Sequence, residues 1–350
     1  MNRLLLIFCC WLTTLLATAQ QVIVVKAGDA QSLLEAISEA NKRNADIDAE
    51  QLFVLIPNGT YDLGTKVLTQ VTGHHIAFVG QGMKSTVIKN CPNREDEGIS
   101  KTGVLQNRGS DNYFQDLTLC NDMDYYTKEN DGRAVTLHDK GTRTILNRVC
   151  LFSHQDTYYS DNEDCQHYLK DSEIHGTVDF ICGTGDVWFE HCKIVTEKRT
   201  TTGKGRNVIA APRTAYTNYG YVFNYCTIEN IISDFQYARG WHTQPRCVWL
   251  HTTLLTPEKL RASRFDPNAI RGVDIFFGEY DTTDAQGHDI TPKSNVITYV
   301  CKEEQKEAET ILTAEAAKKY TLSSFFGDWH PDKVLKATEK KAKKLIKKAF

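Results

Sequence analysis

Two aspartates and one arginine are the residues of this sequence whose types and spacing could do chemistry together. Asp179 lies in the apolar run V-D-F-I of "GTVDFICG", where a buried strand is expected. Because an ionised carboxylate without a partner is costly to bury, Asp179 must either face solvent or serve a reaction. Asp156 precedes it in "SHQDTYY", and Arg239 follows it in the Gly-containing loop "YARGWH". A guanidinium beside Asp179 would keep that acid ionised through paired hydrogen bonds.

A weak repeat indicates which elements position these residues. Six-residue segments with an apolar residue at each end start about 20–35 residues apart, a spacing typical of solenoids. They are FQDLTL from Phe114, LNRVCL from Leu146, LKDSEI from Leu169, FEHCKI from Phe189, FNYCTI from Phe223 and WLHTTL from Trp249. With Gly, Asn, Asp and Thr common between them, the segments favour an all-β parallel β-helix in which each coil supplies a short strand. A β-sandwich of irregular hairpins is the alternative, although the N-G and D-G turn signals do not fall where a meander requires them.

The repeat places Asp156 and Asp179 at the same position of consecutive coils. Asp156 lies five residues after Leu151, the end of one segment, and Asp179 lies five residues after Ile174, the end of the next. Stacking would bring their backbones to about 5 Å, one strand spacing. Two carboxylates so close cannot both ionise easily, so one should keep a proton while the other stays charged. Such a pair supplies a proton donor and a nucleophile at one place.

Amphipathic patterns predict a helix near each end of the chain. The N-terminal pattern is "DAQSLLEAISEANKRN", whose apolar stripe consists of Leu33, Leu34, Ile37 and Ala40. The sequence after Pro331 predicts a basic amphipathic helix at about residues 332–349, whose lysine-rich face we interpret as solvated. Because a solenoid leaves its end coils open, we expect these helices to cap both ends.

The leader and the composition narrow the class of protein. Residues 1–19 have the charged start, apolar core and A-x-A ending of a signal peptide, so we expect an exported protein, periplasmic or secreted, with residues 20–350 as one domain. The net charge of −3 gives no reason to expect nucleic-acid binding. The cysteines form no CxxC pair and no His/Cys ligand spacing, so we expect no structural zinc. We also expect no membrane span in the mature chain, and a monomer.

Several motifs taken together resemble the signatures of the pectin methylesterase family. "SHQDTYY", "GTVDFICG" and "YARGWH" are similar to the family patterns QDTLY, GTVDFIFG and LGRPW, in the same order and with approximately the same gaps. "VLIPNGTYDL", "IAFVGQGMKSTVI", "GRAVTL" and "FFGEYDTTDAQG" resemble further family elements, so the likeness covers roughly Val22 to Val300. The resemblance implies a single-stranded right-handed parallel β-helix without a metal or other cofactor. It also implies hydrolysis of the methyl esters of galacturonate in pectin.

The resemblance further implies roles for the chemical residues. Asp179 resembles the family's nucleophile, and Asp156 resembles its general acid, which later acts as a base. Gln155 matches a donor to the oxyanion, and Arg239 matches the residue that orients the nucleophile. Tyr159 and Trp241 match positions that line the substrate groove.

Three positions depart from the family's pattern. Arg133 stands where the family has a second glutamine oxyanion donor, Cys182 replaces an aromatic residue, and Gly240 replaces a proline. We expect Arg133 to bind substrate by contacting the ester carbonyl or a neighbouring uronate carboxylate. Cys182 should loosen one subsite, and Gly240 should make its loop more flexible.

The sequence leaves alternative interpretations open. Taken singly, Asp156 could be a turn residue, Asp179 a polar residue at a strand end, and Arg239 a surface charge. Trp241 and Tyr159 could instead pack in the interior of a β-helix. The rival functions are a polyuronate lyase, a glycosidase that uses two carboxylates about 5 Å apart with retention, and a non-catalytic galacturonan-binding protein.

Overall fold

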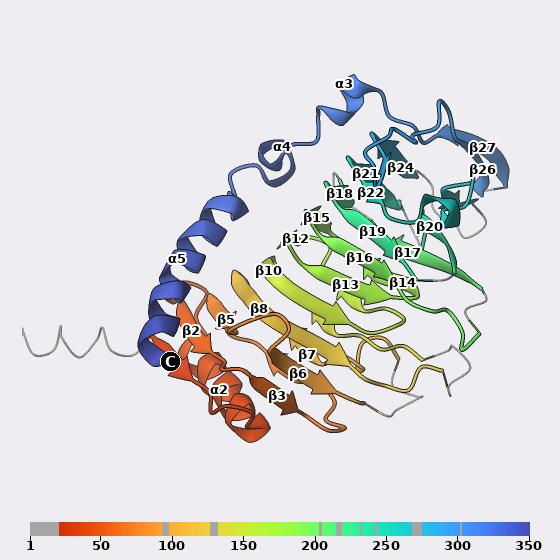
Figure 1. Ribbon diagram of the computed structural model, residues 1–350. Helices are drawn as coiled ribbons and strands as arrows, with labels where there is room; N and C mark the ends of the chain where they lie inside the picture. Colours follow the sequence, from red (N-terminus) through yellow and green to blue (C-terminus); the bar gives the residue numbers. More distant parts are fainter. Residues whose placement is uncertain are drawn as a thin grey trace, which may run out of the picture.

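The computed structural model describes residues 21–350 except 93–97, 127–131, 203–204, 215–218, 232, 242–243, 268–274 and 302. These residues form a solenoid of stacked coils whose strands run parallel (Figure 1). The right-handed parallel β-helix expected from the sequence is confirmed. The expected signal peptide, residues 1–19, lies outside the described residues.

The strands of successive coils pair in three parallel sheets, which we call sheets 1, 2 and 3. Sheet 1 consists of β1 (Val22–Val24), β2 (Leu52–Leu55), β5 (Ile76–Val79), β8 (Asn112–Asn121), β10 (Arg143–Phe152), β12 (Gln166–Lys170), β15 (Asp186–Glu190), β18 (Tyr221–Asn224), β21 (Arg246–Leu250) and β24 (Phe276–Tyr280). Sheet 2 consists of β3 (Gly59–Asp62), β6 (Thr86–Asn90), the second halves of β8 and β10, β13 (Glu173–Gly176), β16 (Lys193–Thr196), β19 (Thr227–Asn230), β22 (Thr253–Leu254) and β25 (Thr283–Asp284). Sheet 3 consists of β4 (Thr69–Val71), β7 (Leu105–Asn107), β9 (Leu137–Asp139), β11 (Tyr158–Ser160), β14 (Val178–Gly183), β17 (Arg206–Pro212), β20 (Asp234–Arg239) and β23 (Phe265–Asp266).

The six-residue repeat found in the sequence is the corner between sheets 1 and 2. Its third residue has a left-handed backbone in every copy, with φ between 49° and 54°, at Asp116, Arg148, Asp171, His191, Tyr225 and His251. A left-handed residue inside extended chain breaks the strand and turns it. The chain therefore leaves sheet 1 and enters sheet 2 at the same station of each coil.

The apolar ends of the repeat form two columns inside the solenoid. Its first residues stack from coil to coil in register, and the rings of Phe189 and Phe223 lie 4.3 Å apart, while those of Phe223 and Trp249 lie 3.7 Å apart. Its last residues, including Ile174 and Ile194, form a second column. All of these side chains are at most 1% exposed, so the repeat is a buried ladder and the sandwich alternative is wrong.

The N-terminal helix is α2 (Ala30–Arg43), and it covers the first coils as expected. Asp29 caps it by accepting a hydrogen bond from the Ser32 backbone N–H at 3.0 Å. Leu33, Ile37 and Ala40 of its apolar stripe are buried against strands β1 to β4.

The C-terminal helix differs in position from the expectation. It is α5 (Pro331–Ala349), close to the predicted bounds, but it lies along the outer face of sheet 1 rather than over the last coil (Figure 1). Thr338 accepts a hydrogen bond from Gln51 at 3.1 Å, and Glu339 pairs with Arg148 at 2.8 Å. The helix turns back because the outer face of sheet 1 is apolar, and Leu335 is buried against it.

One short 3-10 helix, η1 (Pro257–Lys259), lies between β22 and β23. After the last coil come the antiparallel hairpin of β26 (Val296–Cys301) and β27 (Glu304–Glu309) and the short helices α3 (Ala314–Ala317) and α4 (Leu322–Phe326). Ile297 and Tyr299 of the hairpin join the interior core, so the hairpin contributes to closing the C-terminal end. Among the described residues, no helix combines the length and apolarity needed to cross a membrane.

Candidate active site

The two aspartates predicted to form a pair lie on adjacent coils at the edge of sheet 3. Asp156 comes two residues before Tyr158 of β11, and Asp179 comes two residues before Ile181 of β14. Tyr158 and Ile181 are direct partners in the parallel ladder. The expectation that Asp156 and Asp179 occupy equivalent positions is therefore confirmed.

Local backbone geometry explains how a carboxylate can lie in the run V-D-F-I. Val178 pairs with Val208 and Ile181 pairs with Ala210, so β14 contains one residue more than β17 over this stretch. Such a bulge redirects side chains. Asp179 lies in it with φ 52°, a left-handed value, while the next residue, Phe180, is fully buried. The aspartate therefore leaves the strand's alternation and lines a cavity on the outside of the solenoid.

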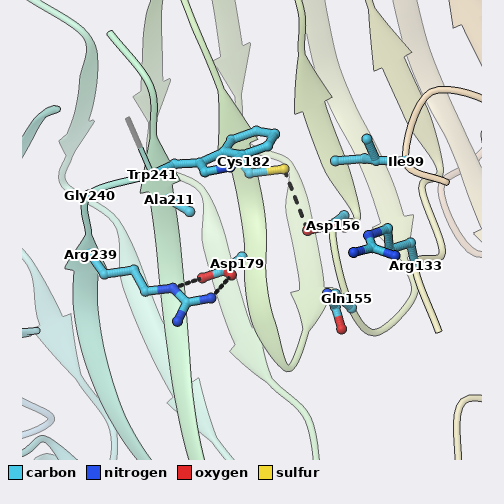
Figure 2. A pocket seen from close by; sticks show the side chains of 10 residues that line it. All are labelled: Ile99, Arg133, Gln155, Asp156, Asp179, Cys182, Ala211, Arg239, Gly240 and Trp241. Carbon is cyan, nitrogen blue, oxygen red and sulfur yellow. Dashed lines mark hydrogen bonds and ion pairs between the residues drawn. The ribbon is translucent and has the colours of Figure 1, made fainter. Parts of the chain in front are cut away.

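Arg239, at the end of β20, holds Asp179 from the side of the later coils. Its Nε donates to Asp179 Oδ1 at 2.7 Å, and its second terminal nitrogen donates to Oδ2, so the pair is bidentate (Figure 2). Burial raises the pKa of Asp179, whereas the hydrogen bonds and charge of Arg239 oppose that rise. The fork fixes the rotamer of the carboxylate and favours its ionised form.

Asp156 is also buried, and its pKa is raised as well. Its side chain is 6% exposed, and burial, followed by the charge of Asp179, raises its pKa to about 8. Arg133 and the thiol of Cys182, which lies 3.8 Å from Oδ1, act in the lowering direction without cancelling the rise. Asp156 therefore carries a proton at neutral pH. With φ 58° at Asp156 and 52° at Asp179, both aspartates have a left-handed backbone.

Gln155 and Arg133 lie next to the aspartates on the side away from Arg239. Their backbones form an isolated parallel bridge between adjacent coils. Figure 2 shows both side chains beside Asp156, across the site from the Asp179–Arg239 pair. Arg133 is exposed and Gln155 is half-buried, so both donors remain accessible to a ligand.

These side chains line one open cavity of about 320 Å³. Its lining consists of Ile99, Arg133, Gln155, Asp156, Asp179, Cys182, Ala211, Arg239, Gly240 and Trp241. Of the seven site residues selected from the sequence, six are in this lining, and Tyr159 is not. Trp241 presents a half-buried ring, and the Arg213 guanidinium lies 5.5 Å from its centre.

Tyr159 lies behind the cavity wall instead of in it. Its side chain is 6% exposed, stacks on His138 at 4.6 Å and tilts against Trp241 at 6.1 Å between ring centres. The structure therefore favours the packing interpretation for this residue. Its ring packs against Trp241, which does line the cavity.

Sequence reasoning did not select two residues of the cavity wall. Ala211 is the ladder partner of Cys182 in sheet 3. It could therefore have been selected as the residue that follows Cys182 at the same position of the next coil. Ile99 belongs to a connection that approaches the site from an earlier coil, and its sequence carries no signal of that approach.

The carboxylates of the cavity are not arranged as a metal site. The carboxylate of Asp179 is paired with the guanidinium of Arg239, and the carboxyl group of Asp156 is in contact with the thiol of Cys182. In the part of the chain that the structure describes, the side chains with metal-ligand spacing are Cys150, Glu173 and His175, which do not line the cavity. The arrangement within the cavity instead fits acyl transfer, with one carboxyl group held by a guanidinium, a second whose pKa is raised to about 8, and nearby amide and guanidinium donors.

Comparison with known proteins finds pectinesterases among the sequence relatives of this chain. It is 27% identical to Pectinesterase 3 of Solanum lycopersicum over 65% of this chain and 41% of that protein. It is 23% identical to the probable pectinesterase 49 of Arabidopsis thaliana over 84% of this chain and 78% of that protein. The chain thus spans about two fifths of the length of the tomato relative and about four fifths of the other.

Solved structures agree with the fold. The pectin methylesterase of Erwinia chrysanthemi superposes with a TM-score of 0.65 at 22% identity, covering 89% of this chain and 98% of that one. The pectin methylesterase from carrot gives a TM-score of 0.66 at 19% identity, covering 87% and 92%. The pectinesterase family model matches residues 21–327, which is most of the chain. The chain therefore belongs to the pectinesterase family.

Proposed function

We propose that the protein hydrolyses methyl esters of galacturonate residues in pectin and releases methanol and de-esterified pectin. The observation that carries the proposal is the pairing of two carboxyl groups on adjacent coils with different partners. Arg239 forms a bidentate ion pair with Asp179 and opposes the rise of its pKa, while burial and the charge of Asp179 raise the pKa of Asp156 to about 8. Membership of the pectinesterase family supports the substrate class.

The first half of the proposed reaction is acylation of Asp179. A carboxylate oxygen attacks the ester carbonyl carbon, and the carbonyl oxygen becomes an oxyanion that accepts a hydrogen bond from the Gln155 amide. The Asp156 carboxyl gives its proton to the leaving methoxy oxygen, so methanol departs and an aspartyl acyl-enzyme remains. The pKa of about 8 lets Asp156 hold this proton at neutral pH and release it readily.

The second half is hydrolysis of the acyl-enzyme. Asp156, now a carboxylate, takes a proton from a water molecule while that water attacks the acyl carbon. The bond to Asp179 breaks, and the product leaves as the carboxylic acid, which loses its proton to solvent to give galacturonate. Asp179 is a carboxylate again and Asp156 a protonated carboxyl, so both aspartates return to their starting states. Arg239 limits rotation of Asp179 throughout, so the same oxygen stays aligned for attack and departure.

Further proposals follow for the substrate contacts and for the state of the protein. Trp241 offers a sugar ring a flat apolar face, and Arg133 contacts either the ester carbonyl or an adjacent uronate carboxylate. The protein acts as a monomer after export, to the periplasm or the cell exterior, and removal of residues 1–19. The sequence of that leader is the support for export.

One experiment separates this reaction from the rival reactions on the same fold. Highly methylated pectin is incubated with the protein, and methanol and new reducing ends are measured in the same samples. We expect methanol without new reducing ends. Reducing ends without methanol would favour a glycosidase or lyase, and binding without either product would favour a non-catalytic galacturonan-binding protein, which the exposed cation Arg133 makes a specific second candidate.

Asp179→Asn tests the proposed nucleophile. The amide is nearly the same size but a poor nucleophile, so the variant should keep its melting temperature within a few degrees and lose almost all methanol release. Circular dichroism provides the folding control. Near wild-type turnover by a homogeneous, folded sample would remove Asp179 from the mechanism.

A further inference from the structure

A second group of chemically active side chains lies on the outer face of sheet 2. Cys150 of β10 is the direct ladder partner of Glu173 of β13, and His175 follows two residues later on the same face. Leu151 and Ile174, between them, point into the core and are fully buried. One donor atom from each of Cys150, Glu173 and His175 lies within 4.8 Å of the other two.

The histidine of this group is oriented by a fourth residue. Glu197, just after β16 on the next coil, has Oε1 2.9 Å from Nδ1 of His175. The other ring nitrogen, Nε2, lies 3.4 Å from Oε2 of Glu173. A carboxylate on Nδ1 fixes the hydrogen there, so a metal that displaced the hydrogen of Nε2 would have the usual arrangement around a metal-bound histidine.

We propose that Cys150, Glu173 and His175 bind one zinc ion, with Glu197 orienting the histidine. Thiolate, imidazole and carboxylate are the donor types that zinc takes in proteins, and three protein ligands leave the fourth position for water. Neighbouring donors of a tetrahedral zinc site are about 3.3–3.8 Å apart, given bonds of about 2.0–2.3 Å. The separation between His175 and Glu173 already matches that spacing. The Cys150 sulfur lies within 4.8 Å of both donor atoms, so a change of side-chain rotamer by at most about 1 Å at the sulfur closes the site.

The surroundings of the group suit a bound cation. Glu173, His175 and Glu197 are 27%, 15% and 17% exposed, so the donors are shielded from water but accessible to an ion. The ring of Phe152 lies 5.1 Å from the imidazole and covers one side. Lys193, the ladder partner of Glu173, forms an ion pair with Glu229 at 2.6 Å, which offsets its repulsion of a metal.

The ion would connect consecutive coils next to the catalytic strand. Its ligands come from two consecutive coils, and Glu197, which orients His175, lies on the third coil. His175 is followed by Gly176 and Thr177, which lead into the strand that carries Asp179. The site therefore acts as a clip on the outer wall, and its effect is on stability and not on the chemical steps at the cavity.

Cobalt(II) substitution is the direct test on the purified, reduced protein after treatment with a chelator. We expect saturation at one cobalt per chain with a thiolate-to-cobalt charge-transfer band in the near ultraviolet, and displacement of that band by zinc. Calorimetry of zinc binding should show proton release, because thiolate must form. Zinc should raise the melting temperature by a few degrees.

Variants assign the ligands. Cys150→Ser should abolish the charge-transfer band, and Glu197→Gln should weaken zinc affinity about 10–100-fold while leaving the band in place. Cys91→Ser removes another half-buried thiol outside the group and should change neither readout. Circular dichroism confirms folding, and Glu173→Gln provides a second ligand variant should Cys150→Ser fail to fold. Absence of a thiolate band in the wild type, or a band that survives both ligand variants, would overturn the proposal.

Discussion

Arg133→Gln is the substitution that tests the electrostatics of the site most sharply. Arg133 stands where the family pattern has glutamine, and its charge lowers the pKa of Asp156 against the larger effect of burial. Replacing it with a neutral amide donor keeps a hydrogen bond available to the oxyanion and removes the charge. We therefore expect the variant to stay active and the pKa of Asp156 to rise above its present value of about 8.

The expected size of the change follows from the exposure of Arg133. Two unit charges about 6 Å apart in an effective dielectric of about 40–80 change each other's pKa by about 0.5–1 pH unit. Asp156 must be protonated to serve as the acid, so kcat/KM falls as pH rises through its pKa. The alkaline limb of the profile should therefore move to higher pH by about 0.5–1 unit in Arg133→Gln.

The assay is methanol release from fully methylated substrate across the pH range, corrected for alkaline ester hydrolysis without enzyme. Arg43→Gln, the same substitution on α2 and outside the cavity, is the matched control and should leave the limb in place. An alkaline limb that stays unmoved in Arg133→Gln, or moves to lower pH, would refute the assigned interaction between Arg133 and Asp156.

Three further predictions concern orientation, metal and core. Arg239→Lys keeps the charge but loses the two-pronged contact with Asp179, so kcat should fall roughly 10–100-fold; equal kcat and pH profile in the lysine variant would show that the fork is unnecessary. A chelator should leave methanol release unchanged well below the melting temperature, and a loss restored by calcium would point to a lyase. Phe189→Ala, in the stacked interior column, should lower the free energy of unfolding by about 3–5 kcal/mol in a denaturant titration, and a loss below about 1 kcal/mol would contradict the ladder's role.

The solenoid and its register could be predicted from the sequence because each coil has the same pattern of buried and exposed positions. An interior position must be apolar in every coil, so residues such as Leu146 and Leu169 mark the same station and pair directly in the structure. Counting from those stations was enough to align Asp156 with Asp179. The order of the short motifs then identified the family, since each motif alone is weak.

Other features depend on contacts between residues whose sequence separation follows no repeat. The basic helix was predicted at the right residues, but only the apolar outer face of sheet 1 determines that α5 lies along the solenoid's side. Tyr159 matched a groove position, yet the packing of His138 and Trp241 around its ring places it behind the cavity wall.

By itself, the sequence determined the coil repeat, the station of the two aspartates and the family, because these follow from periodic burial and local motifs. Only the tertiary structure decided the direction of each side chain. The bulge in β14 turns Asp179 outward, and a single extra residue leaves no periodic signal. The group of Cys150, Glu173 and His175 likewise has no ligand spacing in the sequence, because its members come from different coils. Stacking brings distant residues to within one strand spacing, and that distance is a property of the fold.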